Sequence, residues 1–453
     1  MPLINSISGL RGTIPDSLTP EIVIQYANAF VKFTGVGGTI VIGHDGRPSG
    51  EWICNILEGT LQALGSKVIS IGMAPTPTVQ LATEKSDSVG GISVSASHNP
   101  AQWNGLKFLN SDGIFLDKDE CNTFWSFLDS NLDYVNFNEY NKLLDEKHWT
   151  TKHIFEALSL NFVDLELIEK RNFKVVVDAV NASGSFIVPK LLETCGCEVI
   201  RLYCEGNGEF PHTPEPISEN LNELSKAVIK NNANFGIAVD PDADRLVLID
   251  ENGEPIGEEY TITIAIDFIL AYYKSLMKKD LSCAINLSTT RAVEDIAKRY
   301  GAVVYRTPVG EINVAKKMKE VGSVIGGEGS GGVILPELHF GRDSIAGIII
   351  ILNALARDGR SLSKLRESMP HYFISKKKIT VTDKNNLSDI IIKIKEVEND
   401  GEINTDDGLR IAFNNSWVHL RGSNTEPIIR VIAEAPTPEA AEKLALKYVD
   451  MFS

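Results

Sequence analysis

One order of secondary structure is predicted three times along this chain of 453 residues. Each time, a short apolar strand ends in a polar loop, a helical segment follows, a glycine-led strand comes next, and a third strand runs into another polar loop. The first strands are predicted at 38–42, 173–178 and 283–287, the glycine-led strands begin at Gly65, Gly196 and Gly301, and the third strands lie at 91–94, 235–239 and 323–325. The chain therefore contains an internal triplication of a β-α-β unit.

This repeat places the chain in the α/β class. Apolar strands that alternate with helices form sheets covered on both faces, with ligand loops at the strand ends. After residue 368 a smaller α+β unit is predicted, with strands at 375–381, 410–413 and 428–433 and an amphipathic helix at 438–448. We expect three successive similar α/β domains with mixed sheets plus a C-terminal α+β domain around a central cleft, with boundaries 1–150, 151–254, 255–368 and 369–453.

The charge of the chain limits its class of partner. An apolar share of 43% supports several packed domains, while 44 Lys and Arg against 60 Asp and Glu give a formal charge of −16. Such a surface repels nucleic-acid backbones and anionic lipids, so we expect no nucleic-acid and no membrane partner. A small anionic substrate must instead meet basic side chains gathered at one place in the fold.

The sequence predicts neither export nor membrane insertion. The N-terminus lacks the charged start and apolar core of a secretory signal. The most apolar stretch, 345–352, is far shorter than the roughly 20 residues of a bilayer crossing. Six scattered cysteines without a C-x-x-C pair predict buried, reduced thiols. We expect a soluble, cytoplasmic protein, whose oligomeric state the sequence does not specify.

Three aspartates follow the third strand of the second repeat. Asp240, Asp242 and Asp244 concentrate negative charge that a cation would relieve, and ligation by oxygen alone points to magnesium or a similar hard ion. With Glu251 they also match four positions of a calcium EF-hand loop, but Arg245 replaces its turn glycine and the flanks predict strands. A solvated acidic turn and a D-x-D phosphatase nucleophile are the other interpretations.

The corresponding loop of the first repeat carries a candidate nucleophile. Ser97 follows a buried-looking strand and precedes Pro100, which predicts an exposed loop residue on a rigid scaffold. A purely structural turn serine is the alternative. His98 beside it is a candidate catalytic residue, although a turn hydrogen bond would also explain it. Lys107 would neutralise a phosphate or shuttle a proton, unless it is an ordinary surface lysine on a strand.

The third repeat ends in a glycine-rich loop at 326–332. No amphipathic helix follows it, so a dinucleotide site is disfavoured. Glu328 and Ser330 would instead hydrogen-bond adjacent hydroxyls of a sugar. A tight turn without a ligand explains the same residues.

The C-terminal domain offers a candidate phosphate site. Segment 421–427 gathers a guanidinium, two hydroxyls, an amide and backbone N–H groups, a set that suits a tetrahedral dianion. Turn capping would need no ligand. The candidate substrate-binding residues here are Arg421, Ser423, Asn424, Thr425 and Arg430.

Together, these four loops resemble those of the α-D-phosphohexomutase family, in the same order over the whole chain. The Ser-His-Asn-Pro loop resembles the family's phosphoserine loop, and the three aspartates resemble its magnesium site. The glycine-rich loop and segment 421–427 resemble its sugar and phosphate loops. The resemblance implies an isomerase that interconverts hexose 6-phosphate and hexose 1-phosphate through a phosphoserine enzyme and a hexose 1,6-bisphosphate.

The resemblance also implies roles for individual residues. Ser97 would carry the phosphoryl group and bind Mg²⁺ together with the three aspartates. Arg11, Lys107 and Arg245 match family positions near the transferred group, and Lys107 would act as general acid and base if its pKa falls well below its free value. Because the bisphosphate must turn end for end, the Arg421 loop would bind the distant phosphate and the C-terminal domain is expected to hinge.

One position departs from the family pattern. The sugar loop of the family often ends in histidine, but this chain has Gly332, so no role of that histidine carries over. The Gly-Gly ending and the loops at 309–311 and 423–430 resemble archaeal-type phosphoglucosamine and phosphomannose mutases. The resemblance therefore favours phosphoglucosamine mutase over phosphomannomutase or phosphoglucomutase. Glu328 would suit an ammonium but would equally accept hydroxyl bonds, and one or two contacts decide the sugar.

Two functions of other classes are weighed against the mutase. A D-x-D sugar-phosphate phosphatase would use Asp240 or Asp242 as nucleophile, release inorganic phosphate and tolerate Ser97→Ala. A non-catalytic sugar-phosphate binding protein would show neither phosphate on Ser97 nor turnover.

Overall fold

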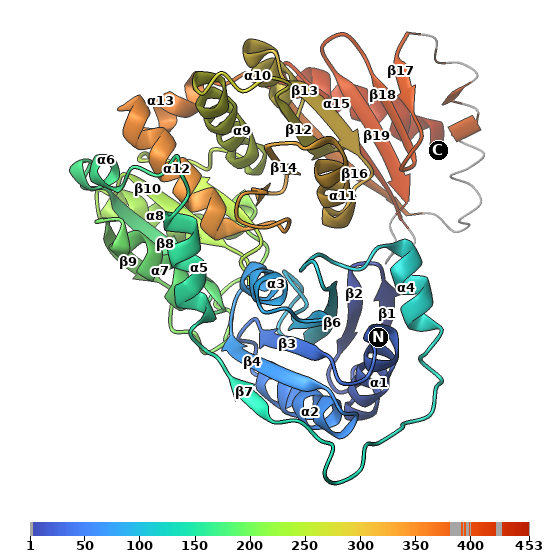
Figure 1. Cartoon of the computed structure of the whole chain (residues 1–453). Helices are drawn as coiled ribbons and strands as arrows, with labels where there is room; N and C mark the ends of the chain where they lie inside the picture. The colour runs from blue at the N-terminus through green and yellow to red at the C-terminus, as the bar shows by residue number, and fades with distance from the viewer. Residues whose placement is uncertain are drawn as a thin grey trace.

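The predicted domains follow one another along the chain. The computed structural model describes residues 3–380, 391, 392, 394, 395, 398, 400–422 and 428–452. Figure 1 shows four units in sequence from blue to red, which we number domains I to IV. Three are α/β units with mixed sheets and the fourth is an α+β unit, so the expected fold class is confirmed. The residue boundaries given above stay predictions.

Domain I is built on a seven-stranded sheet in the order β1-β2-β6-β5-β3-β4-β7. Its strands are β1 Ile4–Ser6, β2 Gly9–Thr13, β3 Thr39–His44, β4 Lys67–Met73, β5 Gly90–Val94, β6 Trp103–Asn110 and β7 Leu143–Asp145. Its helices are α1 Pro20–Thr34, α2 Gly50–Ala63, α3 Thr76–Lys85 and α4 Lys118–Trp125.

Domain II has a four-stranded sheet in the order β11-β10-β8-β9. Its strands are β8 Lys174–Asp178, β9 Glu198–Leu202, β10 Phe235–Val239 and β11 Leu246–Ile249. Its helices are α5 Trp149–Leu158, α6 Leu165–Lys170, α7 Gly184–Thr194 and α8 Asn222–Lys230, with a short 3-10 turn η1 Ser218–Asn220.

Domain III has a four-stranded sheet in the order β13-β12-β14-β15. Its strands are β12 Ser282–Asn286, β13 Val303–Thr307, β14 Ile325–Glu328 and β15 Gly332–Ile334. Its helices are α9 Glu258–Ser275, α10 Ala292–Tyr300, α11 Glu311–Val321, α12 Ser344–Asp358 and α13 Leu362–Glu367.

The three sheets share one topology, which confirms the triplication. The orders β4-β3-β5-β6, β9-β8-β10-β11 and β13-β12-β14-β15 are equivalent, with three parallel strands followed by an antiparallel fourth. The loop between the third and fourth strand therefore leaves each sheet at the same position. These are the serine, aspartate and glycine-rich loops found in the sequence.

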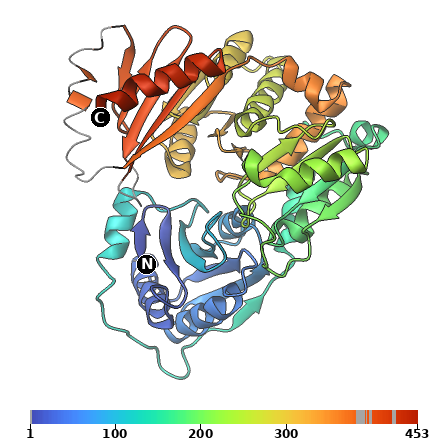
Figure 2. The same cartoon turned by 180° about the vertical axis from the view of Figure 1, so that it is seen from behind.

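Domain IV is an antiparallel sheet in the order β16-β20-β19-β18-β17. Helix α15 lies across one face of this sheet, as the view from behind shows in dark red (Figure 2). The strands predicted at 375–381, 410–413 and 428–433 correspond to β16, β18 and β20. Residue 381 lies outside the described residues. The elements are β16 Phe373–Thr380, β17 Glu402–Asn404, β18 Leu409–Ala412, β19 Trp417–Gly422, β20 Ile428–Ala435, α15 Pro438–Val449 and η2 Asp450–Phe452.

Several strands were not predicted. The first pair, β1 and β2, and the edge strands β7 and β17 are short and lack a clear apolar alternation. Strand β19 lies between β18 and β20, so the two strands predicted there are not direct neighbours.

The parallel strands are covered by helices on both faces. Along β3, Ile40 and Ile42 pack with α1 and α2, whereas Val41 packs with α3 on the opposite face. This alternation follows from the period-two geometry of a strand. Domains II and III share one apolar core, because the almost fully buried helix α12 packs against α5, α6 and α9. The apolar stretch noted in the sequence is this central helix.

A buried polar cluster joins domains I, II and III. Asp343 precedes α12 and accepts hydrogen bonds with Oδ2 from His153 of α5 at 2.9 Å and from His339 at 3.2 Å. The other ring nitrogen of His153 contacts Thr78 of α3 at 2.9 Å, and that of His339 accepts the Gly341 N–H at 3.0 Å. All four ring nitrogens are therefore engaged, which indicates a structural joint.

The described helices and cysteines bear on two further expectations. No helix in the described part of the chain is long and apolar enough to span a bilayer. All six cysteines are free and five of them are buried, as expected for reduced thiols.

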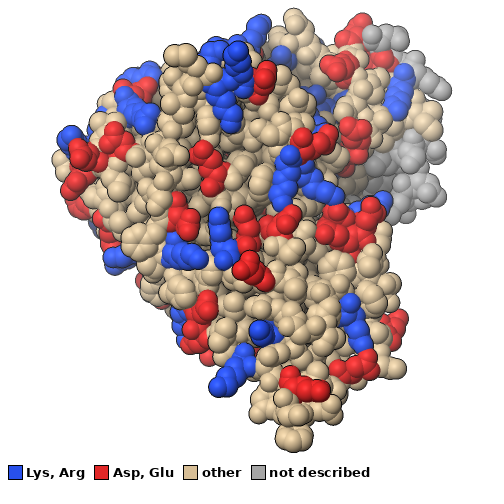
Figure 3. All heavy atoms as spheres, in the orientation of Figure 1, with Lys and Arg blue, Asp and Glu red and all other residues tan. Residues whose placement is uncertain are grey.

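On the face shown in Figure 3, basic side chains are interspersed with acidic ones rather than gathered in a stripe.

We predict that Asp343→Ala destabilises the protein by about 3 kcal/mol, because it leaves two buried histidines without an acceptor and removes the side-chain cap of α12. Denaturant unfolding followed by circular dichroism measures the change. The exposed Asp358 at the other end of the same helix is the control, and Asp358→Ala should change stability by less than about 0.5 kcal/mol. Equal effects of the two substitutions would contradict a structural role of the buried Asp343 cluster.

Candidate functional site

Ser97 lies in the loop that leaves β5 and is nearly inaccessible to solvent. Its backbone is in the left-handed region with φ of 51°, a conformation that costs about 1–3 kcal/mol and persists only where the surroundings impose it. Ser95 Oγ accepts the Ser97 N–H at 2.8 Å. The Ser97 hydroxyl donates to Asp240 Oδ2 at 3.1 Å and lies 3.3 Å from His98 Nδ1. The loop therefore directs the hydroxyl toward the aspartates of domain II.

Arg47, from the first polar loop of domain I, holds the serine loop in place. Its guanidinium is 1% exposed and donates to the carbonyl oxygens of Ser97, Asn99 and Pro100 at 2.5, 2.8 and 2.9 Å. Asp45 Oδ2 accepts from its Nε at 3.0 Å and balances its charge. The planar fork of arginine suits several fixed acceptors at once. The sequence marked this loop as part of the repeat but assigned Arg47 no role.

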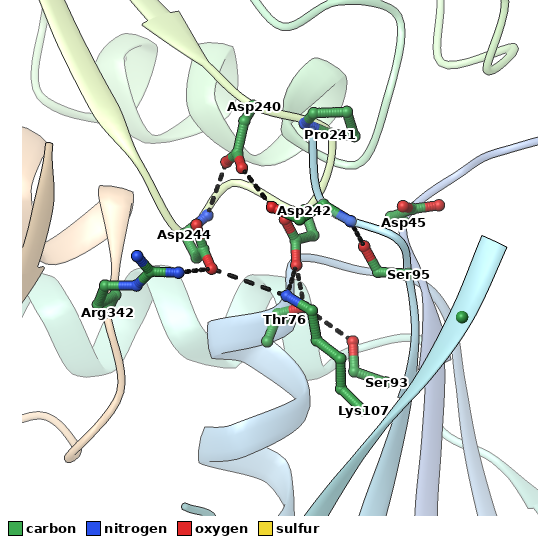
Figure 4. Close-up of polar contacts among 12 residues, drawn as sticks. Asp45, Thr76, Ser93, Ser95, Lys107, Asp240, Pro241, Asp242, Asp244 and Arg342 are labelled. Atoms are coloured by element: carbon green, nitrogen blue, oxygen red, sulfur yellow. Dashed lines mark hydrogen bonds and ion pairs between the residues drawn. The ribbon is translucent and has the colours of Figure 1, made fainter. Parts of the chain in front are cut away.

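The three aspartates converge at the end of β10 (Figure 4). Asp240, Asp242 and Asp244 are each 0% exposed, and one carboxylate oxygen from each lies within 4.8 Å of the others. Burial, followed by the Asp244 and Asp242 carboxylates, raises the pKa of Asp240 well above its usual value. The Oδ1 atoms of Asp242 and Asp244 are buried and have no hydrogen-bond partner in the part of the chain that the structure describes. These unsatisfied oxygens fit a hard cation such as Mg²⁺.

The calcium-loop interpretation is wrong. The aspartate segment connects two strands, β10 and β11, rather than two helices. Glu251, its twelfth position, accepts hydrogen bonds from the Ser363 N–H and hydroxyl at 3.1 and 2.5 Å, beyond the far end of β11. It therefore contributes nothing to the aspartate cluster. The aspartates are also fully buried, which excludes a solvated acidic turn.

Two cations from other domains neutralise the aspartates. Lys107 of β6 lies 2.5 Å from Asp242 and 3.7 Å from Asp244, and at 3% exposure it is not a surface lysine. Arg342 of domain III donates to Asp244 Oδ2 at 2.5 Å. Burial alone would lower the pKa of Lys107, but Asp242 and Asp244 outweigh it and raise that pKa. The lowered pKa that acid–base work by Lys107 requires is therefore absent from this arrangement.

Arg11, Arg245 and His98 surround the serine on the cleft side. Arg11 of β2 donates to Asn99 Oδ1 at 3.2 Å, within the serine loop. Arg245 Nε lies 3.8 to 3.9 Å from the carboxylates of Asp244 and Asp240. Burial and the guanidinium groups of Arg245 and Arg11 lower the pKa of His98 to about 2. His98 is therefore neutral at physiological pH.

The glycine-rich loop is the hairpin between β14 and β15. Glu328 Oε1 accepts from Asn286 Nδ2 at 2.8 Å and from the Gly310 N–H at 3.0 Å, while Oε2 accepts from Arg342 at 2.8 Å. Ser330 lines the cleft beside it. A Cβ on Gly332 would lie 2.3 Å from Arg342 Cδ, so the arginine occupies the space of any side chain there. A histidine at this position would therefore require Arg342 to move.

Domain IV contributes a row of basic side chains. Lys378 of β16, Arg430 of β20 and Arg421 of β19 are cross-strand neighbours in register, and all three line the cleft. Like charges side by side repel, so this row favours a bound anion. Ser423, Asn424 and Thr425, the other predicted residues of this loop, lie outside the described residues.

All four domains line one cleft with a volume of about 890 Å³. Such a volume is typical of sites for small metabolites. The structure brings together Ser97, Lys107 and the aspartates, with Arg11, Arg245 and His98 beside them. The glycine-rich loop and the basic row of domain IV form other walls of the same cleft. Sequence reasoning missed Arg47, Asn286, Arg342 and Lys378, although Lys378 closes the longest basic run and Arg342 precedes the most apolar stretch.

Comparisons with known proteins match the same family in all four domains. Family models described as phosphoglucomutase/phosphomannomutase α/β/α domains I, II and III match residues 4–132, 152–253 and 258–373, and the model of the C-terminal domain matches 377–451. A phosphoglucomutase/phosphomannomutase of Thermococcus kodakarensis is 37% identical, covering 96% of this chain and 95% of its own. A probable phosphoglucosamine mutase of Methanopyrus kandleri is 33% identical, with 98% and 96% coverage.

A solved structure shares the fold. A phosphoglucomutase/phosphomannomutase family protein from Burkholderia thailandensis superposes with a TM-score of 0.85 over 99% of this chain and 97% of its own, at 24% identity.

We predict that Asp240→Asn abolishes stabilisation by Mg²⁺. At a concentration about 100 times its Kd, the ion should stabilise the unmodified protein by about 2.7 kcal/mol. The variant should gain little, yet its metal-free form should be at least as stable, because one of three repelling carboxylates is removed. Thermal unfolding with EDTA or Mg²⁺ measures both effects. Asp250→Asn, in the turn after β11, serves as control and should respond to Mg²⁺ like the unmodified chain.

Proposed function

The chain belongs to the phosphoglucomutase/phosphomannomutase family and is a phosphohexomutase of the isomerase class, and we propose that it converts glucosamine 6-phosphate to glucosamine 1-phosphate through a phosphorylated Ser97. The observation that supports this assignment is the strained serine held against three buried aspartates. A family relative named as a probable phosphoglucosamine mutase supports the choice of sugar.

The reaction transfers one phosphoryl group twice. In the first step the bond between phosphorus and Ser97 Oγ breaks, a bond forms to the free hydroxyl at C1 of the hexose 6-phosphate, and the hydroxyl proton leaves to a base. The product is a hexose 1,6-bisphosphate. After it turns end for end, Ser97 Oγ takes the phosphoryl group from C6, the C6 oxygen regains a proton, and hexose 1-phosphate leaves.

The residues around Ser97 balance the charge of this transfer. Arg11 and Arg245 line the cleft beside the serine, where their guanidinium groups can contact phosphoryl oxygens. A magnesium ion held by the aspartates would supply further positive charge to these oxygens when bound. Lys107 is bound to Asp242, so we assign it to neutralising the aspartates. His98 Nδ1 lies 3.3 Å from the Ser97 hydroxyl, and we assign His98 to orienting that hydroxyl, because a ring with a pKa of about 2 is too weak a base to take up its proton.

The basic row of domain IV would hold the phosphate that is not reacting. Lys378, Arg430 and Arg421 come from the domain at the end of the chain, away from the serine loop of domain I. Because the bisphosphate must reverse its direction, both of its phosphates must fit this row in turn. A single connection joins domains III and IV, between α13 and β16, and we propose that domain IV hinges there.

The phosphatase alternative is less well supported by the contacts. Asp242 accepts from Thr76 Oγ1 at 2.7 Å and from Lys107, and Asp240 accepts the Ser97 hydroxyl and two backbone N–H groups. Both candidate nucleophiles are thus occupied and buried. The Ser97 hydroxyl instead lies beside Asp240, next to His98 and Asn99, which line the cleft.

We predict that Ser97→Ala abolishes isomerisation, lowering kcat at least about 10⁴-fold, since the group that carries the phosphoryl is lost. Phosphorus NMR with Mg²⁺ and a trace of hexose 1,6-bisphosphate follows the conversion of glucosamine, glucose and mannose 6-phosphates. Ser275→Ala, at an exposed serine of α9, should behave like the unmodified chain. Release of free phosphate by the Ser97→Ala variant would favour the phosphatase, and a 1-phosphate forming faster from glucose or mannose would correct the substrate.

We predict that Lys378→Met lowers kcat/KM about 10- to 100-fold, because it removes one charge-assisted phosphate contact. The neighbouring Lys377 points to the other face of β16, where it pairs with Glu442 at 2.6 Å. Lys377→Met should therefore leave kcat/KM within about twofold. Steady-state kinetics compares the two variants. Equal losses would contradict phosphate binding by the basic row of domain IV.

A further inference from the structure

Among the described residues, four glutamates line the cleft, and three of them lie within ion-pair distance of an arginine or a lysine. Glu328 accepts from Arg342 at 2.8 Å. Glu258 accepts from Lys376 at 2.8 Å. Glu215 lies 4.0 Å from Arg245 and 3.9 Å from His98. The fourth is Glu259, in the first turn of α9.

Glu259 has no ion pair within 4.0 Å in the part of the chain that the structure describes. Its one hydrogen bond comes from the Thr290 N–H, which Oε2 accepts at 2.9 Å. The cation with the largest effect on it, Lys376, is committed to Glu258. Burial of this carboxylate raises its pKa to about 8. An unpaired carboxylate in a sheltered position is unfavourable, and a cation that entered the cleft would relieve this cost.

The Glu259 carboxylate touches the glycine-rich loop. A Cβ on Gly329 would lie 2.0 and 2.1 Å from its two oxygens, so the loop accepts this carboxylate only because residue 329 is glycine. Gly329 stands between Glu328 and Ser330, the residues proposed to bind sugar hydroxyls. The unpaired carboxylate therefore lies against the middle of the loop that would contact the sugar ring.

Glu328 is poorly suited to bind an ammonium. Its Oε1 accepts from Asn286 and from the Gly310 N–H, and its Oε2 accepts from Arg342. A further cation would have to compete with the Arg342 guanidinium. Glu259 offers Oε1, for which no partner is found among the described residues. Its carboxyl has a pKa of about 8 without a ligand, and a neighbouring ammonium group would favour its ionised form. Glu259 is therefore better placed than Glu328 to bind an ammonium group.

We propose that Glu259 is the residue that selects an amino sugar, with its carboxylate accepting a charge-assisted hydrogen bond from the ammonium group of a hexosamine phosphate. This inference rests on the proposed function and names the contact that sets its substrate. A neutral hydroxyl in the same place would gain an ordinary hydrogen bond but would leave the carboxylate unneutralised.

The decisive variant is Glu259→Gln, which keeps the shape of the side chain and an acceptor for the Thr290 N–H. It should lower kcat/KM for glucosamine 6-phosphate about 10- to 100-fold and change kcat/KM for glucose and mannose 6-phosphates by less than about threefold. Glu254→Gln, at an exposed position before the same helix, is the control and should leave all three values unchanged. Equal losses for the three sugars, or no loss for glucosamine 6-phosphate, would overturn the inference.

Binding separates this inference from the proposed function. In the Ser97→Ala background, which cannot turn over, calorimetry with each sugar phosphate should show that Glu259→Gln weakens glucosamine 6-phosphate alone. Unmodified enzyme that prefers glucose or mannose 6-phosphate in turnover would contradict the proposed substrate. In that case, a change in the glucosamine-to-glucose affinity ratio caused by Glu259→Gln would still support the role of Glu259. An unchanged ratio would contradict it.

Stability against pH gives a third readout. A carboxyl whose pKa is about 8 in the folded state binds a proton that the unfolded chain has lost above its own lower pKa, so its contribution declines as pH rises from about 4.5 to 8. Glu258 on α9, Lys376 on β16 and Glu434 on β20 act on this carboxyl. Glu259→Gln should therefore gain thermal stability relative to the unmodified protein at pH 8.5 compared with pH 5. A difference that does not change with pH would show that the carboxylate is paired in solution.

Discussion

The buried negative charge at the end of β10 is the constraint on which the rest of the site depends. Three carboxylates at 0% exposure repel one another, and the protein cannot leave them without compensation. Lys107 approaches from domain I and Arg342 from domain III, while the aspartates belong to domain II. No single domain contains the compensated cluster, so the site exists only in the assembled chain. Two carboxylate oxygens still lack a hydrogen-bond partner among the described residues, which fits a divalent cation.

Arg342 neutralises a carboxylate of the glycine-rich hairpin as well as one of the aspartates. The same guanidinium binds Asp244 in the aspartate cluster and Glu328 in the glycine-rich hairpin, and it fills the space beside Gly332. One side chain thus joins the aspartate cluster and the glycine-rich hairpin. Because Arg342 satisfies Glu328, Glu259 is the one glutamate without an ion pair among the described residues that line the cleft. If Glu259 selects the sugar as proposed, Arg342 would affect substrate choice without touching the substrate.

The three-fold repeat explains how one chain builds several different sites at one place. Each α/β sheet sends out a loop between its third and fourth strand, and the equivalent topology brings these loops to one cleft. The loops differ in length and in chemistry: one carries a strained serine, one a group of aspartates, and one is a glycine-rich hairpin. Domain IV has another topology and adds basic side chains from the face of an antiparallel sheet. A net charge of −16 is compatible with an anionic substrate because a group of basic side chains lines this cleft.

The sequence by itself determined the repeated units and their polar loops, because strand and helix periodicity and glycine placement are local properties. Ser97, the aspartates and Arg421 could be singled out since each lies in a short, chemically unusual segment. Only the tertiary structure decided which charges meet. Arg342 is 98 residues from Asp244, Glu259 is 31 from Thr290, and no local pattern links them. The pKa of Lys107 and the pairing state of each glutamate follow from such contacts, because electrostatic energy depends on distance and burial in space rather than on separation along the chain.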